Sequence, residues 1–381
     1  MMQRGFEPRE FEQRTQAAQR MMQAAGLDAL LLSTEADVRY FTGYLTRFWE
    51  SPARPWFLIV PATSDPVAVI PTIGAELMGR SWITDIRTWR SPDYDDDGVG
   101  LLAATIKELG IKTLATPMGL ETHLRMPLDD YARLEATLGS KIASDDGMIP
   151  ALRMVKSDVE VAAIQTACDV ANRAFARVPE IAKAGVPLST VFRKFQMLCL
   201  DEGADFVPYL SGGAGQGGYD DVISPASDTP LADGDILMLD TGLIVDGYFC
   251  DFDRNFAVGV PSEAVANGHA KLIAAVDAAM AITKPGATAA DLFHAMDAIT
   301  TGGAGGSDTG RLGHGLGMQL TEWPSLIPAD HTVLTEGMVL TLEPGIEVGG
   351  GKMLVHEENI VVTADGARFL STPYGRDMVQ L

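Results

Sequence analysis

The segment LDTGLIVDGYFCDFDRNF, residues 239–256, carries four aspartates in an apolar stretch with the pattern of a β-hairpin. The Asp-Gly dipeptide at 246–247 favours a two-residue hairpin turn. With the turn placed there, Asp240 faces Asp253 across the strand pair, and Asp251 lies diagonal to Asp240 on the same face. Three carboxylates this close either share protons or hold a cation, unless the hairpin is a solvated edge with scattered acids.

Four further candidate ligands follow later in the chain. The motif RLGHGLGM surrounds His314 with glycines, where a backbone can approach a ligand closely. VLTLEPGI places Glu343 at the end of an apolar strand, and LVHEENIVVT places Glu357 and Glu358 at the start of another. Taken singly, these are ordinary loop and turn residues. Together, carboxylates with one imidazole suit Mn²⁺, Fe²⁺, Co²⁺ or Zn²⁺, and bridging carboxylates can hold two ions.

Helix and strand signals alternate in the first part of the chain. Helices are predicted over residues 11–26 and 100–110, each ending at a glycine. Residues 28–33, 56–62 and 66–71 have the pattern of short apolar strands. This alternation predicts a small α/β domain over residues 1–150.

A second domain is expected over residues 151–381, with helices first and strands later. Ser157 and Glu160 match a capping box, which opens a long helix predicted over residues 159–185. Strands are predicted after it, separated by turn residues. Such an order predicts an α+β domain built on an antiparallel sheet. The predicted strands are residues 235–242, 248–259, 337–346 and 358–366.

Composition limits the partners and the compartment. The 381 residues, of which 46% are hydrophobic, suffice for two folded cores. A formal net charge of −22 repels phosphate backbones and anionic lipids, so neither nucleic acid nor a membrane is an expected partner. The sequence has no apolar run of about 18 residues and no apolar signal segment. With its three cysteines as reduced structural thiols, a cytoplasmic protein is expected.

Five motifs carry a resemblance to a known family. They are LDTG with Asp240, GYFCDFDR with Asp251, GHGLG with His314, LEPG with Glu343 and EENI with Glu357. The chain resembles the pita-bread metallopeptidase superfamily (peptidase family M24), which includes methionine aminopeptidase, prolidase, aminopeptidase P and creatinase. Upstream, DALLLSTEADVRYFTGY resembles the creatinase-type N-terminal domain. The resemblance implies an α+β fold, in which a small α/β creatinase-like domain precedes a pita-bread catalytic domain with a curved antiparallel sheet flanked by helices.

The resemblance also implies a role for each ligand. Asp240 would chelate one divalent ion, His314 and Glu343 the other, and Asp251 with Glu357 would bridge them. Two ions of Mn, Fe, Co or Zn would activate a bridging hydroxide as the nucleophile, with Glu343 as general base and acid. The implied activity is a metallohydrolase, an Xaa-Pro dipeptidase or aminopeptidase or an enzyme that cleaves a C–N bond of a small amino-acid-like substrate. The implied assembly is a homodimer.

The chain departs from the peptidase pattern on the substrate side. The peptidases have a histidine seven residues beyond the metal histidine, where this chain has Thr321 followed by Glu322. They have another before the first aspartate, where this chain has Asp221 nearby. Because those imidazoles contact the scissile amide, Asp221, Thr321 and Glu322 are candidate substrate-binding residues. Trp49 is a further candidate, since in related dimers the N-terminal domain reaches over the partner's active site; packing in the small domain's core is the alternative.

Three residues are expected behind the metal ligands. They are Asp253, where many relatives have threonine, His356, where they often have arginine, and Glu358, which replaces Glu357 as ligand if the last strand shifts by one residue. Two other activities stay open on this scaffold, a dimethylsulfoniopropionate lyase and a creatinase-type enzyme. A non-catalytic binding module is disfavoured, because such modules lose the ligands that this chain keeps.

Overall fold

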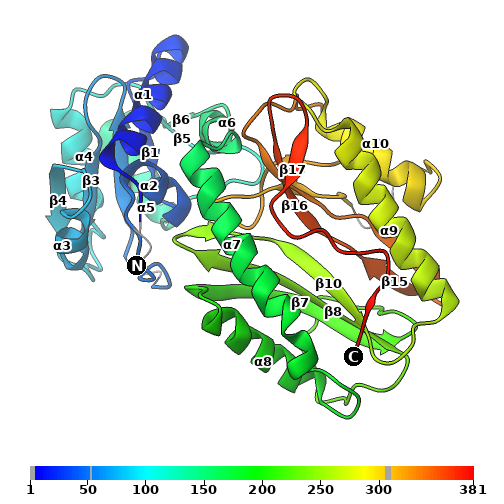
Figure 1. Cartoon of the computed structure of the whole chain (residues 1–381). Coiled ribbons are helices and arrows are strands. Elements are labelled where there is room, and N and C mark those ends of the chain that lie inside the picture. The colour runs from blue at the N-terminus through cyan, green and yellow to red at the C-terminus, as the bar shows by residue number, and fades with distance from the viewer. Residues whose placement is uncertain (1–4, 52–53, 305–309) are drawn as a thin grey trace. The chain divides into compact units, whose positions relative to one another are not determined.

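The computed structural model describes residues 5–51, 54–304 and 310–381. The chain divides into two compact units, Met1–Arg153 and Met154–Leu381. We call them the N-terminal unit and the C-terminal unit and describe each by itself (Figure 1).

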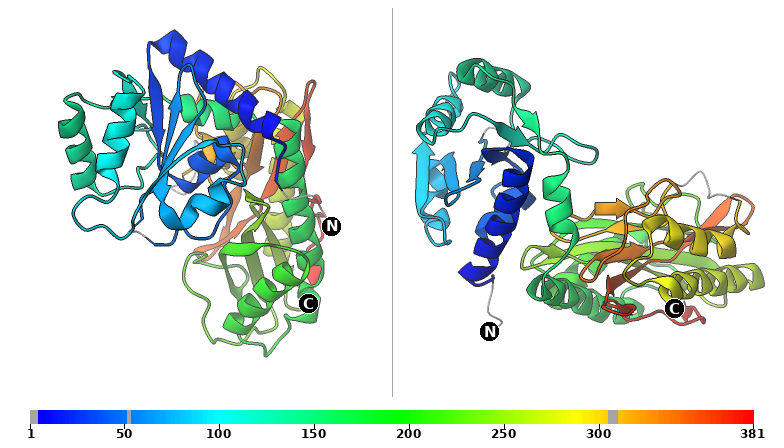
Figure 2. Two further views of the ribbon diagram at one scale, coloured as in Figure 1. Left: turned by 90° about the vertical axis from the view of Figure 1, so that its left-hand side faces the viewer. Right: turned by 90° about the horizontal axis from the view of Figure 1, so that it is seen from above.

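The N-terminal unit is a mixed six-stranded sheet with helices on both faces. Its strands are β1 (Ala29–Leu32), β2 (Phe57–Pro61), β3 (Val67–Pro71), β4 (Asp85–Trp89), β5 (Leu114–Thr116) and β6 (Ala143–Ser144), in the order β4-β3-β2-β1-β5-β6. Its helices include α1 (Pro8–Ala25), α2 (Glu35–Thr42), α4 (Val99–Glu108) and α5 (Leu128–Leu138). Helices α1 and α2 lie on one face of the sheet and α4 and α5 on the other (Figure 2, left).

Local sequence signals explain these elements. Helix α1 has Pro8 in its first turn and ends at Gly26, whose φ of 69° forms a left-handed cap. Strands β1, β2 and β3 are buried at every residue, as expected for strands covered by helices. The predicted helices and strands of this part of the chain are therefore confirmed.

The helices of the C-terminal unit include α7 (Asp158–Ala176), α8 (Leu188–Asp201), α9 (Glu263–Ile282) and α10 (Ala289–Thr300). The predicted capping box is confirmed, since Ser157 and Glu160 exchange their side-chain and backbone hydrogen bonds at the start of α7. The prediction that this helix runs to residue 185 is wrong. It ends at Ala176 because Pro179 has no N–H to donate to the Phe175 carbonyl, and the short 3₁₀ turn Val178–Glu180 follows.

The strands of the C-terminal unit form two five-stranded sheets and a separate hairpin. The first sheet contains β7 (Phe206–Gln216), β8 (Asp235–Val245), β9 (Tyr248–Phe249), β10 (Phe252–Ala257) and β18 (Val379–Gln380). The second contains β11 (His314–Gly315), β12 (Glu322–Ser325), β13 (Val339–Leu342), β16 (Glu358–Val362) and β17 (Ala367–Phe369), and the hairpin is β14 (Gly345–Gly349) with β15 (Lys352–Val355). The predicted α+β class is confirmed, although the strands expected in one curved sheet divide into two hydrogen-bonded sheets.

The predicted hairpin has the predicted register. Asp240 of β8 lies opposite Asp253 of β10, and Val245 lies opposite Tyr248. The turn residues Asp246 and Gly247 have φ values of 50° and 83°, as a type I′ turn requires.

Side chains join the two sheets where β10 approaches β16. The Asn359 Oδ1 atom accepts the Asp251 N–H at 2.9 Å, and the Asn359 side-chain amide donates to the Asp251 carbonyl. The Glu357 N–H donates to the Asp253 Oδ1 atom at 3.1 Å. Side-chain hydrogen bonds thus connect β10 and β16, which belong to different sheets, and they bring Asp251 of one sheet beside Glu357 of the other.

Helices cover both sheets of the C-terminal unit. Helix α7 packs on β8 and α8 on β7, whereas α9 packs on α10 and on the β14–β15 hairpin (Figure 1). The apolar faces of α9 and α10 close over β13 and β16, where Leu292, Phe293, Leu340 and Ile360 are almost fully buried. Of the helices in the described ranges, none is both long and apolar enough to cross a membrane.

Candidate metal centre

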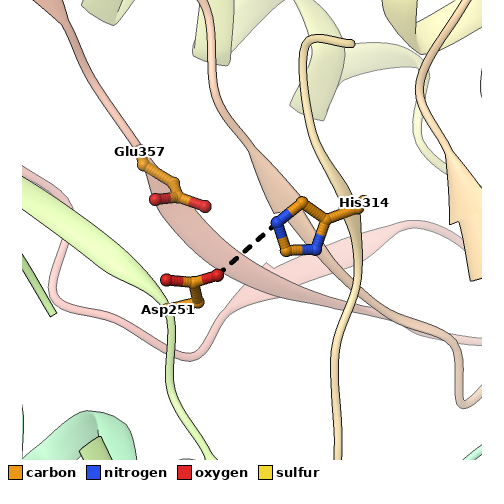
Figure 3. Close-up of side chains that lie close together, drawn as sticks. All are labelled: Asp251, His314 and Glu357. Atoms are coloured by element: carbon orange, nitrogen blue, oxygen red, sulfur yellow. Dashed lines mark ion pairs between the residues drawn. The ribbon is translucent and has the colours of Figure 1, made fainter. Parts of the chain in front are cut away.

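Three predicted ligands from three separate segments converge in the C-terminal unit. Asp251, His314 and Glu357 are buried, and each offers a ligand atom within 4.8 Å of the other two (Figure 3). The His314 Nε2 atom lies 3.5 Å from the Asp251 Oδ2 atom. Its Nδ1 atom lies 2.8 Å from the Gly315 carbonyl oxygen, which can only accept a hydrogen bond. Nδ1 is therefore the protonated nitrogen, and Nε2 presents its lone pair to the carboxylates.

The glycines around His314 serve strand packing. A Cβ atom at Gly313 would lie 2.3 Å from the Thr341 carbonyl oxygen, and one at Gly315 would lie 2.1 Å from that of Trp323. Gly313 also has a φ of 138°. The close approach expected here thus occurs between neighbouring strands, and it holds the His314 backbone between β12 and β13.

Asp240 and Glu343 complete the acidic group. The Tyr209 hydroxyl donates to the Asp240 Oδ2 atom at 3.0 Å, on the buried side of β8. Glu343 directly follows β13 and is half-buried. Its negative charge raises the pKa values of Asp240, Asp251 and Glu357, so its carboxylate lies close enough to interact with theirs.

Burial is the main cause of the unusual proton affinities at this site. It raises the pKa of Asp240, Asp251 and Glu357 well above the usual range, and the charges of neighbouring acids, Asp253 and Glu343 among them, raise those pKa values further. Burial, followed by the charge of Asp253, raises the pKa of Glu343 to about 7. Burial lowers the pKa of His314 to about 4, with Arg311 as the second cause.

The donor set fits divalent cations. Within the described ranges, four buried carboxylate oxygens at the site accept no hydrogen bond, an arrangement that is costly unless a cation meets them. They are Asp240 Oδ1, Asp251 Oδ1, Asp253 Oδ2 and Glu357 Oε1. Carboxylates with one imidazole suit first-row divalent ions, in agreement with the composition of this group.

Buried charged side chains, His356, Glu358 and Arg254, form a chain of ion pairs that contacts Asp253. The His356 Nε2 atom lies 3.2 Å from Glu358 Oε1, and its Nδ1 atom lies 3.5 Å from Asp253 Oδ1. Arg254 forms an ion pair with Glu358 at 2.9 Å. Burial would raise the pKa of Glu358, but the Arg254 charge lowers it to about 2, so Glu358 is committed to this pair. Glu357, not Glu358, therefore faces the other ligands.

The four predicted substrate-binding residues have different surroundings. Asp221 is exposed, and its carboxylate accepts the backbone N–H groups of Ile223 and Ser224 in a turn. Glu322 is buried in an ion pair with Lys156 at 3.1 Å. Trp49 is buried in the N-terminal unit against Tyr44 and Trp56, as in the core alternative. Thr321 is half-buried and accepts a hydrogen bond from Arg311. Roles for them in substrate binding stay predictions.

Two residues near the ligands were not found from the sequence. Tyr209 carries no motif, and only the β7–β8 register reveals that its strand runs beside Asp240. Arg311 lies three residues before His314 in GRLGHG, and this proximity was a usable signal.

Two known protein families match the chain. The model of Metallopeptidase family M24 matches residues 162–364, and that of the Creatinase/Prolidase N-terminal domain matches residues 14–155. The probable dipeptidase PepE of Mycobacterium tuberculosis is 29% identical over 368 residues, which cover 96% of this chain and 95% of the relative. The Xaa-Pro dipeptidase of Pyrococcus horikoshii is 28% identical over 356 residues, covering 92% and 94%.

Solved structures agree with this comparison. Dipeptidase PepE from Mycobacterium ulcerans superposes with a TM-score of 0.83 at 28% identity, covering 99% of each chain. The prolidase from Pyrococcus horikoshii superposes with a TM-score of 0.81 at 25% identity, covering 95% of this chain and 99% of the other.

Proposed function

This chain belongs to metallopeptidase family M24, and on that premise we propose that it hydrolyses Xaa-Pro dipeptides with two divalent metal ions held among its buried acids. The observation that carries the proposal is the convergence of Asp251, His314 and Glu357, buried and with carboxylate oxygens that lack donors. The relatives named as Xaa-Pro dipeptidases support the substrate class, since they match almost the whole chain.

We assign the ions to five residues. Asp251 and Glu357 would be shared between the ions, Asp240 would hold one ion, and His314 with Glu343 would hold the other; the proximity of Asp251, His314 and Glu357 supports this assignment. Bound divalent ions supply Lewis-acid chemistry, which lowers the pKa of water and polarises an amide carbonyl.

Glu343 is the residue we assign to proton transfer. It is half-buried, whereas Asp251 and Glu357 are only 3% and 2% exposed, so its carboxylate can face both the acids and a substrate. In the metal-free protein, burial raises its pKa to about 7. Its Oε atoms would take a proton from the attacking water and deliver it to the departing proline nitrogen.

Assembly and compartment are further parts of the proposal. We propose a homodimer of chains in which residues 1–150 and 151–381 fold as separate domains, consistent with two compact units. A cytoplasmic location is supported by three buried, unpaired cysteines. Light scattering and cell fractionation test these two points.

The central experiment is reconstitution. Metal-free protein is loaded with Mn²⁺, Fe²⁺, Co²⁺ or Zn²⁺ in turn and assayed for proline release from Gly-Pro, Ala-Pro and Leu-Pro. We expect two ions per chain, and activity that Asp251→Asn lowers by about 1,000-fold or more. Asp201→Asn removes a similar charge from the exposed face of α8 and should change nothing. No proline release under any metal would contradict the proposal, and acrylate release from dimethylsulfoniopropionate would favour the lyase alternative.

A further inference from the structure

Asp253 is a buried carboxylate to which the five-residue assignment gives no role. It lies on β10 opposite Asp240 of β8, so the two side chains share one face of the sheet. Its Oδ1 atom accepts the Glu357 N–H at 3.1 Å. Its Oδ2 atom is buried and accepts no hydrogen bond from the residues that the structure describes. An oxygen in this position is costly to bury unless a cation binds it.

The charge of Asp253 acts on the predicted ligands. Burial, followed by this charge, raises the pKa of Asp240 and of Glu343. Burial is also the first cause of the raised pKa values of Asp251 and Glu357, and the Asp253 charge adds to it. Because Coulomb interactions weaken with distance, Asp253 belongs to the same buried group as these four acids.

A chain of ion pairs holds the other oxygen of Asp253. The His356 Nδ1 atom lies 3.5 Å from Asp253 Oδ1, and its Nε2 atom lies 3.2 Å from Glu358 Oε1. Glu358 pairs in turn with Arg254 at 2.9 Å and accepts the Tyr374 N–H at 2.8 Å. These contacts approach Asp253 from the side of Oδ1, so they fix the carboxylate and leave Oδ2 open to an ion.

Positions 253 and 356 both depart from the pattern of the relatives. Many relatives are expected to have threonine at the first position, and arginine is often expected at the second. Threonine carries no charge, so Asp253 adds a metal-binding carboxylate at this place. The imidazole of His356 lies against that carboxylate and is itself held by Glu358.

We propose that Asp253 is a sixth metal-binding residue, which holds the same ion as Asp240 and is positioned by His356. The inference rests on the proposed function, because it needs the metal centre, and it extends the ligand set. The five-residue assignment gives one ion His314 and Glu343 but gives the other only Asp240 besides the shared acids. Asp253 supplies that second ion with another carboxylate. A site richer in carboxylates suits Mn²⁺ more than Zn²⁺, which imidazole suits better.

The test is calorimetric titration of the metal-free protein with Mn²⁺ and with Zn²⁺. Asp253→Thr and Asp253→Asn should each lower the affinity for one of two ions, by about 100-fold for Mn²⁺ and about tenfold for Zn²⁺. The matched control is Asp235→Asn on β8, which should bind both metals as wild type does. Asp235 is also buried, but its two oxygens accept hydrogen bonds from Gln216 at 2.6 Å and from the Ala232 N–H at 2.8 Å.

A second readout separates a ligand from a residue that only supports the fold. Saturating Co²⁺ gives visible absorption bands that depend on the atoms bound to the ion. We expect Asp253→Thr to change these bands and Asp235→Asn to keep them. Unchanged bands in Asp253→Thr, or Mn²⁺ and Zn²⁺ affinities that fall by the same factor, overturn the assignment of Asp253 as a ligand.

His356 is tested as a positioning residue by a double-mutant cycle. His356→Gln should lower the Mn²⁺ affinity by about tenfold in the wild-type background and by less than about twofold in Asp253→Thr. Equal losses in the two backgrounds overturn the positioning role.

Failure of this inference is distinguishable from failure of the proposed function. A wild type that binds two ions, with Asp253 variants that bind them equally well, overturns the Asp253 assignment alone. A wild type that binds none of the ions overturns the metal centre of the proposed function, and the sixth ligand with it.

Discussion

The two carboxylate oxygens of Asp240 have different surroundings. Oδ2 accepts the Tyr209 hydroxyl at 3.0 Å, whereas Oδ1 is buried without a donor. Burial and the Asp240 charge raise the pKa of Tyr209, so the phenol stays protonated and remains a donor. Tyr209 therefore fixes the orientation in which Oδ1 faces the other acids.

Removing the Tyr209 hydroxyl should weaken metal binding. We expect Tyr209→Phe to lower the affinity for the ions by about 10- to 100-fold, because Asp240 loses the bond that orients it. Activity should return at saturating metal. Calorimetric titration of the metal-free protein measures the affinity. The matched control is Tyr248→Phe, which removes a buried hydroxyl bonded to Glu160 at 3.1 Å and should leave metal affinity unchanged.

The sequence predicts the surroundings of some residues but not of others. The candidate ligands stood in recognisable motifs, and the structure brings Asp251, His314 and Glu357 together. The Lys156–Glu322 ion pair joins residues 166 positions apart, so no local sequence pattern predicts it. Glu322 is predicted as a substrate-binding residue because it follows the position of the missing histidine, and only the fold reveals its buried partner Lys156.

At the scale of elements, the β8–β10 hairpin was the most predictable feature. Its register follows from the turn dipeptide and the alternation of side chains, both of which are local. The division of the strands into two sheets was not predictable, because it depends on Asn359 reaching the backbone of Asp251 from 108 residues away. The early end of α7 was missed although Pro179 was visible in the sequence.

The hairpin turn gives a prediction about stability. Gly247 has a φ of 83°, which an L-residue with a side chain adopts at a cost of about 1–2 kcal/mol. Gly247→Ala should therefore lower the Tm by about 3–6 °C. Asp246→Asn is the control, since asparagine suits the same turn position, and it should shift the Tm by less than about 1 °C. Equal Tm values for Gly247→Ala and wild type would contradict the turn assignment; thermal unfolding followed by circular dichroism measures both.

At the scale of the whole molecule, the buried acids make the stability of the metal-free protein depend on pH. Asp240, Asp251 and Glu357 have raised pKa values in the fold, so above pH 4 the folded chain binds more protons than the unfolded one. Their contribution to stability is present at low pH and is lost as pH rises through the raised values. His314 and His269, with pKa values lowered to about 4, act in the opposite direction, but only below about pH 6.5.

Above pH 7, His314 and His269 contribute no further change. We expect the Tm of metal-free protein to fall between pH 7 and 8.5, because the buried acids, and His356 with its raised pKa, lose protons as the pH rises. Added Mn²⁺ should raise the Tm more at pH 8.5 than at pH 6, because fewer protons compete for the carboxylates. Differential scanning calorimetry with and without the ion measures both shifts.

One substitution tests whether the buried acids, and not a general effect of pH, lower the stability of the metal-free protein at high pH. Asp251→Asn removes a repelling charge from the buried group, so the metal-free variant should be more stable than wild type at pH 8.5, by about 3 °C. The same variant lacks a shared ligand and should lose most of the Mn²⁺-induced rise in Tm. Asp201→Asn should keep both wild-type responses. If Asp251→Asn is less stable than wild type without metal yet responds fully to Mn²⁺, the buried acids are stabilised by neighbouring protein groups alone, and the metal assignment fails.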